Sequence, residues 1–198
     1  MTSIDIPGYR PGTWVLDPSH SEVTFSVRHM MISKVRGTFG VKSATLIAPE
    51  NPLEARVEAS VDVTSIDTKD EGRDTHLRSG DFFDTENFPT MEFVSTGARA
   101  EGGELFVDGD LTIRGITKPV SFELDFGGFG SDPWGNYKAG ASAKTVINRE
   151  DFGLTWNAAL ETGGVLVGKD VTISLDLQGA LQQDLSLIHI SEPTRPER

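Results

Sequence analysis

The chain has 198 residues, 37% of them hydrophobic, and carries a formal net charge of −12 at pH 7 with no cysteine. This length suits one well-buried domain. The missing cysteines exclude disulfides, thiolate metal sites and thiol catalysis. The acidic balance argues against a nucleic-acid surface, which needs clustered Lys and Arg, and disfavours firm docking on anionic lipid.

The start of the chain bears on its compartment. Residues 1–11 are polar and lack both the basic start and the apolar stretch of a secretory signal. No apolar run approaches the roughly 20 residues that a membrane-spanning helix needs. Together with the absence of cysteine, these features predict a protein of the bacterial cytoplasm.

The first strands are predicted from the alternation of apolar and polar residues, because successive side chains on a strand point to opposite faces. A short strand over residues 13–16 ends at a turn formed by residues 17–20. Residues 22–29 then alternate without error. The apolar face of that strand carries Val23, Phe25, Val27 and His29.

The next segments contain two strands and one interruption. Residues 35–47 hold two glycines, which indicate a bend or bulge, and residues 53–64 form the longest clean alternation in the chain. Residues 67–84 are charged and break the pattern. Because Asp67 and Thr68 are N-cap candidates, we predict a short helix followed by a loop in this region.

The second half of the chain returns to strands separated by turn signals. The predicted strands cover residues 90–97, 105–113, 120–126, 137–147 and 165–177. Alternating alanines at positions 139, 141 and 143 either leave space inside a barrel or let a neighbouring segment pack closely. The whole pattern predicts an all-β fold, an extended antiparallel β-barrel of about eight strands with a short helix in the 67–84 region.

The alternation stops after Gln183. Residues 184–198 fit no barrel strand and resemble the translation of a sequencing adapter or vector read-through more than a natural terminus. We therefore expect a single barrel domain over residues 1–183, with the tail and its His189 outside the barrel.

Several sequence blocks occur in an order that matches one protein family. They are Trp14-Val-Leu-Asp-Pro-Ser-His-Ser, Val27-Arg-His29, Val35-Arg-Gly-Thr-Phe39, Asp74-Thr-His-Leu-Arg-Ser-Gly-Asp-Phe-Phe83 with Phe88-Pro89, Gly109-Asp-Leu-Thr-Ile-Arg-Gly-Ile-Thr-Lys-Pro-Val120, and Asn148-Arg-Glu-Asp-Phe-Gly-Leu-Thr-Trp156. Their combination resembles the YceI-like family of bacterial polyisoprenoid-binding proteins over residues 12–179. The resemblance implies a lipocalin-like barrel whose lumen holds a long isoprenoid chain, such as a polyprenyl phosphate or a quinone tail. Exported members carry a leader that this chain lacks, so it resembles an intracellular member.

The apolar lumen is the first candidate site. A barrel of about eight strands either fills its interior with side chains or leaves room for one ligand, so each candidate either contacts a ligand or packs in a core. We expect the loop with Phe82, Phe83 and Phe88 to close one end of the barrel. The candidate lumen residues are Phe25, Val27, His29, Phe39, Phe82, Phe83, Phe93, Leu111, Ile113, Phe122, Leu124, Phe126 and Trp156.

Charged and polar residues provide the second set of candidates. Arg149 either meets a phosphate head group through charge-assisted hydrogen bonds or pins the irregular segment 148–156. His29 either contacts a head group or makes a local hydrogen bond, as we expect of His20 and His76. The spacing of these histidines matches no metal-binding motif, so we predict neither a metal site nor a cofactor.

Three functions remain open on the sequence. The first is non-enzymatic binding, carriage or sequestration of a long-chain isoprenoid lipid. The second is an isomerase or cyclase that uses the same lumen with His29 as general base, although no nucleophile motif is present. The third is a stress-related interaction protein with a filled barrel. We expect an isoprenoid ligand and a homodimer, with no nucleic acid and no firm membrane association.

Overall fold

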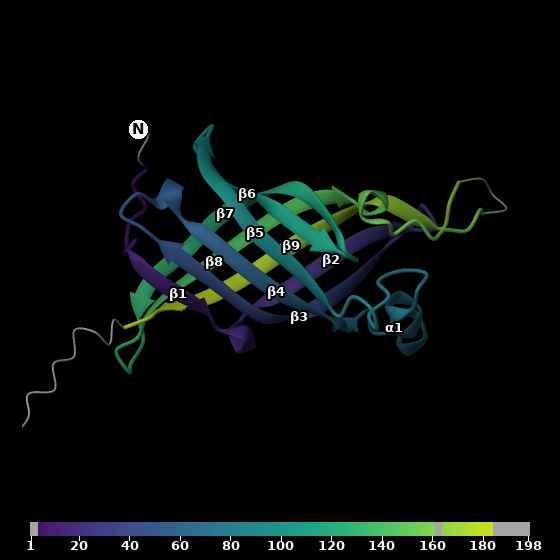
Figure 1. Ribbon diagram of the computed structural model, residues 1–198, viewed down its shortest axis with the longest axis horizontal. Coiled ribbons are helices and arrows are strands. Elements are labelled where there is room, and N and C mark those ends of the chain that lie inside the picture. Colours follow the sequence, from purple (N-terminus) through teal and green to yellow (C-terminus); the bar gives the residue numbers. More distant parts are fainter. Residues whose placement is uncertain (1–3, 161–163, 184–198) are drawn as a thin grey trace, which may run out of the picture.

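The protein is a closed antiparallel β-barrel (Figure 1). The computed structural model describes residues 4–160 and 164–183, and the predicted tail lies outside them. The barrel of about eight strands expected from the sequence is confirmed. The strands are β1 (Gly12–Leu16), β2 (Glu22–His29), β3 (Ser33–Ala48), β4 (Arg56–Asp67), β5 (Thr90–Glu101), β6 (Glu104–Ile113), β7 (Ile116–Ser131), β8 (Tyr137–Asn148) and β9 (Val167–Leu181).

The barrel has eight strand positions in its wall, and two of the nine strands share one of these positions. The closing pair is β3 with β4, and β2 lies between β3 and β9. β1 pairs with the same two neighbours further along, where Trp14 is opposite Leu46 on one side and Leu181 on the other. β1 and β2 therefore share one position in the wall, separated by the 3-10 turn η1 (Pro18–His20).

The predicted helix is present as α1 (Glu71–Arg78), the only α-helix in the part of the chain that the structure describes. Its N-cap is Asp70, whose side chain accepts a hydrogen bond from the Arg73 N–H. The expected caps Asp67 and Thr68 were wrong, because both precede the cap position and their side chains bond elsewhere. The Asp67 carboxylate accepts from the Lys69 N–H, and buried Thr68 donates to Asp74.

The barrel is filled at one end and hollow at the other. The filled half lies at the end that carries α1, opposite the N-terminus in Figure 1. Its most deeply buried side chains are Val63, Ile66 and Phe152, each about 1% exposed. Two further 3-10 turns, η2 (Pro52–Glu54) and η3 (Arg149–Phe152), connect strands at the hollow and filled ends respectively.

Candidate functional site

The hollow half contains a cavity of about 300 Å³. All nine strands contribute to its wall, and nearly all of the lining is apolar. The lining residues are Ile6, Tyr9, Trp14, Val15, Leu16, Val23, Val41, Ala44, Thr45, Leu46, Pro52, Ala55, Val57, Ala59, Val61, Met91, Glu92, Phe93, Ala98, Leu105, Phe106, Val107, Leu111, Phe122, Leu124, Phe126, Phe129, Ala139, Ala141, Ala143, Ile173, Leu175, Leu177 and Gly179.

Small inward side chains create this space. The alternating alanines Ala139, Ala141 and Ala143 all line the cavity, and Ala141 lies between Phe126 on β7 and Leu177 on β9. Because interiors are close-packed wherever side chains reach each other, a run of alanines on one strand leaves a void that its neighbours do not fill. Of the two interpretations of these alanines, the structure shows the one that leaves space.

The floor of the cavity is the boundary with the filled half. Val23, Met91 and Leu111 line the cavity and also belong to the buried core cluster. Phe93 narrows the lumen beside them, because its ring occupies the space that a side chain at Gly109 would need. These side chains separate the cavity from the core around α1.

The N-terminal segment covers part of the cavity mouth. Ile6 and Tyr9 line the cavity, and the Tyr9 hydroxyl donates a 2.6 Å hydrogen bond to the Pro49 carbonyl. The Tyr137 hydroxyl donates to the Gly8 carbonyl at 2.5 Å. Two hydrogen bonds thus hold this segment against the barrel rim. In one the segment's Tyr9 is the donor, and in the other its Gly8 carbonyl is the acceptor.

Five of the candidate lumen residues line this cavity, namely Phe93, Leu111, Phe122, Leu124 and Phe126. The others do not line it. Phe25, Phe39, Phe82, Phe83 and Ile113 pack in the filled half.

Three further candidates also lie away from the cavity. Val27 and His29 continue along β2, opposite Val35 and Ser33. Trp156 packs against the core cluster in the filled half, and the His76 ring meets it edge-on at 4.7 Å between centroids. His29 is therefore not placed to act on a molecule in the hollow half.

Arg149 is only 3% exposed and donates to the protein's own backbone. Its Nε bonds to the Gly168 carbonyl at 2.7 Å and its Nη1 to the Trp156 carbonyl at 3.1 Å, with further bonds to the carbonyls of Leu154 and Val167. Burial lowers the pKa of this guanidinium. The geometry is that of a residue that pins the irregular segment to the start of β9, and Arg149 does not line the cavity.

Sequence reasoning missed much of the lining. Tyr9 and Ile6 lie in a segment without periodicity, so no signal marked them. Leu175 and Leu177 lie two residues apart on the last strand, where the alternation that selected Phe122 and Phe126 could have found them. The alternation does not tell where along the barrel axis each inward-facing residue lies.

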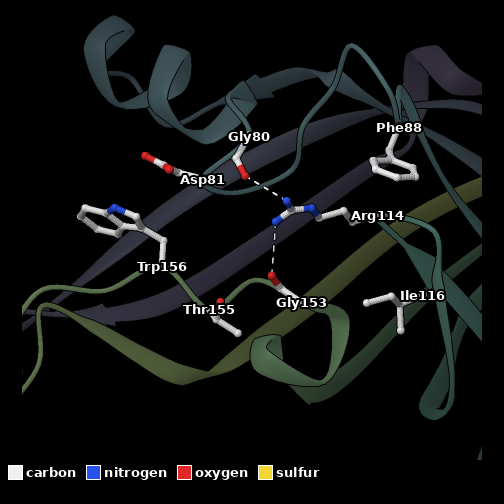
Figure 2. Close-up of a pocket in the computed structure, with 8 residues that line it drawn as sticks. All are labelled: Gly80, Asp81, Phe88, Arg114, Ile116, Gly153, Thr155 and Trp156. Atoms are coloured by element: carbon white, nitrogen blue, oxygen red, sulfur yellow. Dashed lines mark hydrogen bonds between the residues drawn. The ribbon is translucent and has the colours of Figure 1, made fainter.

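A second hollow, an open cleft of about 630 Å³, lies among the loops at the α1 end (Figure 2). Arg114 spans it, donating to the Gly80 carbonyl at 3.0 Å and the Gly153 carbonyl at 3.3 Å. Asp81 and Trp156 flank the cleft, and the Asp81 carboxylate lies 2.9 Å from His76 Nε2. Arg114 thus joins two loops over the filled half, and the cleft opens widely to solvent.

Other classes of site find little support in residues 4–160 and 164–183. No three His, Cys, Asp or Glu side chains cluster there as a metal site requires. No helix in that part of the chain has the length and apolar character needed to cross a membrane.

The fold and the sequence place the chain in a known family. A family model described as a YceI-like domain matches residues 14–179. The chain belongs to the YceI-like family. A UPF0312 protein of Staphylococcus aureus (strain MSSA476) is 37% identical over 172 residues, which are 86% of this chain and 98% of the relative. A UPF0312 protein of Staphylococcus aureus (strain USA300) shows the same identity and coverage.

Solved structures show the same barrel. The crystal structure of Burkholderia cenocepacia BcnA is similar with a TM-score of 0.70 at 22% identity, covering 82% of this chain and 98% of that one. A polyisoprenoid binding domain from Saccharophagus degradans has a TM-score of 0.64 at 14% identity, covering 85% and 98%. At these identities the likeness concerns the fold.

Proposed function

We propose that this YceI-like protein binds an isoprenoid lipid, with the apolar tail in the hollow half of the barrel. The observation that carries the proposal is the apolar cavity walled by all nine strands. A pocket that offers hydrocarbon on every side selects a hydrocarbon ligand, because burial of apolar surface is its main source of affinity. The similar domain from Saccharophagus degradans is a polyisoprenoid binding domain, which supports the same ligand class.

The cavity size sets how much of a tail enters. An engineered apolar cavity of about 150 Å³ holds benzene, so the 300 Å³ found here has room for roughly a dozen carbons. Burying that many methylene-sized groups gives a gross gain on the order of 10 kcal/mol, and association costs offset part of it. Carriage or sequestration of a long-chain lipid, such as a polyprenyl phosphate or a quinone, requires the tail to displace the floor or extend past the mouth.

Binding is favoured over catalysis because the polar groups of Tyr9 and Glu92, two of the lining residues, are engaged outside the lumen. The Tyr9 hydroxyl bonds to the backbone at the rim. The Glu92 carboxylate accepts from the hydroxyls of Ser60 and Thr90 on the exposed side of the sheet. His29, the general base of the enzyme alternative, lies outside the cavity lining. The isomerase or cyclase alternative is therefore not favoured.

The experiment compares the lipid content of three purified proteins by extraction and mass spectrometry after exposure to an isoprenoid alcohol such as farnesol. Ala141→Phe fills the hollow half with a ring. Ser142→Phe adds the same ring to the exposed face of the same strand and is the matched control. We expect lipid in the unmodified chain and in Ser142→Phe, and little in Ala141→Phe. An unmodified chain that takes up no isoprenoid contradicts the proposal.

A further inference from the structure

The β2–β3 hairpin ends in an apolar tip formed by Met30, Met31 and Ile32. Their exposed fractions are 45%, 58% and 84%. The Met31 Sδ lies beside Gly164, yet all three side chains keep a large exposed surface. An exposed apolar cluster of this kind marks an interaction site more often than a packing element.

The backbone of the tip is strained. Met30 and Met31 have φ values of 54° and 61°, and the Ile32 N–H donates to the His29 carbonyl at 3.3 Å. Turns with two central residues at positive φ favour Asn-Gly or similar pairs, because a side chain such as methionine is strained there. The turn itself therefore does not explain the choice of two methionines, and strain at an exposed position points to a function.

A basic collar surrounds this tip. It consists of Arg28, Lys34 and Arg36, all exposed on the outer face of the hairpin. Arg28 and Lys34 lie directly opposite each other across the two strands, and like charges in that position destabilise a sheet.

The collar also lacks neutralising partners. In the described part of the chain, no carboxylate forms an ion pair with any of the three cations. The sequence has no Asp or Glu from Val23 to Pro49, although the whole chain carries a net charge of −12. A local excess of positive charge on an acidic protein indicates an anionic partner.

We propose that the tip and the collar form a docking element for an anionic membrane surface. Lys34 lies two residues beyond Ile32 along β3, so its backbone sits about 7 Å behind the tip. Surface-bound apolar groups enter the headgroup and acyl boundary to roughly 5–10 Å. Insertion of the tip to that depth brings Arg28 and Lys34 level with the lipid phosphates, while Arg36 lies farther from the surface.

The shape of the element favours a membrane over other partners. A protein partner needs about 800 Å² on each side for a stable interface, and a three-residue point does not supply it. A second copy of the hairpin would bring two sets of collar cations together. A membrane accepts a small convex apolar point and supplies the negative charge. Since the rest of the chain is acidic, the contact is reversible and sensitive to salt.

The test measures binding of the full chain to phosphatidylcholine vesicles with and without phosphatidylglycerol, by flotation. Met30→Asn combined with Met31→Gly keeps the turn and removes the apolar side chains. We expect this variant to be at least as stable as the original and to bind anionic vesicles more than about tenfold less. Arg28→Gln and Lys34→Gln each reduce binding about fivefold.

Two controls separate the hairpin from general surface effects. Val146→Ser removes an apolar residue that is 60% exposed on another strand, and Lys42→Gln removes a cation on β3 about 26 Å from Lys34. Neither should change vesicle binding appreciably. Ala141→Phe, which fills the lumen, should bind vesicles normally, so failure of lipid uptake and failure of docking are read separately. Absence of binding to anionic vesicles, or equal losses in the controls, overturns the proposal.

Discussion

The two halves of this barrel share the same strands and the same alternation, yet one is packed and the other is empty. β8 shows the difference within a single strand, since Ala141 and Ala143 face the cavity and Ile147 belongs to the core. On β4, Ala59 lines the cavity and Val63 is buried in the filled half. Alternation decides which residues point inward, and side-chain volume decides whether the inside has space.

The two halves also differ in what they contribute to the protein's stability. The filled half carries the core cluster, α1 and the Arg149 hydrogen bonds. The hollow half forgoes packing contacts, because the walls of a void have no partner atoms on one side. Stability should therefore depend most on the α1 end, and ligand uptake on the other.

The largest expected effects are losses of stability in the filled half, and the first of them is at Arg149. Arg149→Leu leaves buried carbonyls without their donor and should lower the free energy of unfolding by about 3 kcal/mol or more. Arg56→Leu, at an exposed arginine on β4, should change it by less than about 0.5 kcal/mol. Urea unfolding measures both. Equal losses of unfolding free energy in the two variants would show that Arg149 does not stabilise the filled half.

A pair of core truncations compares the halves directly. Phe152→Ala, at a side chain 1% exposed, should destabilise by about 3–5 kcal/mol. Leu177→Ala, in the cavity wall, should destabilise by less than about 2 kcal/mol, because fewer neighbours contact it. Thermal or urea unfolding gives both values. A larger loss at Leu177 would show that the hollow half is packed in solution.

The floor residue Met91 tests what limits the length of a bound tail. Met91→Ala should cost about 2 kcal/mol of stability and deepen the cavity. Tails longer than a dozen carbons should then gain affinity relative to shorter ones, as measured with isoprenoid alcohols of increasing length. Val94→Ala, on the exposed face of β5, should leave the length preference unchanged. An unaltered preference in Met91→Ala would place the limit elsewhere.

The smallest expected effect is on the pH dependence of stability, at an ion pair on the outer surface. Hydrogen bonds from Ser121 and then Arg99 lower the pKa of the Asp108 carboxyl. A depressed pKa adds stability above the unfolded value near 3.9, and this is lost as the pH falls through the folded pKa. Because the pair is exposed, the contribution is below about 1 kcal/mol. Asp108→Asn should reduce the acid-induced loss of stability slightly, as pH-dependent unfolding would show.

The sequence predicts the wall of the barrel better than its contents. Alternation identifies Phe93, Leu111 and Phe122 as inward-facing, and it does the same for Phe39 and Ile113, which belong to the core. Height along the axis depends on register between distant strands, which one strand's pattern does not contain.

Other features escaped the pattern for related reasons. The N-terminal cover has no periodicity, and the Arg149 acceptors are backbone carbonyls that leave no mark in the sequence. A homodimer and cytoplasmic localisation stay predictions of the sequence.

A crystal structure of the protein with an isoprenoid alcohol bound would show directly whether the hollow half is the lipid site. We expect elongated density in the hollow half, in contact with Ala139, Ala141 and Ala143. Density confined to the Arg114 cleft, or a lumen closed by repacked side chains while lipid is bound elsewhere, would contradict it.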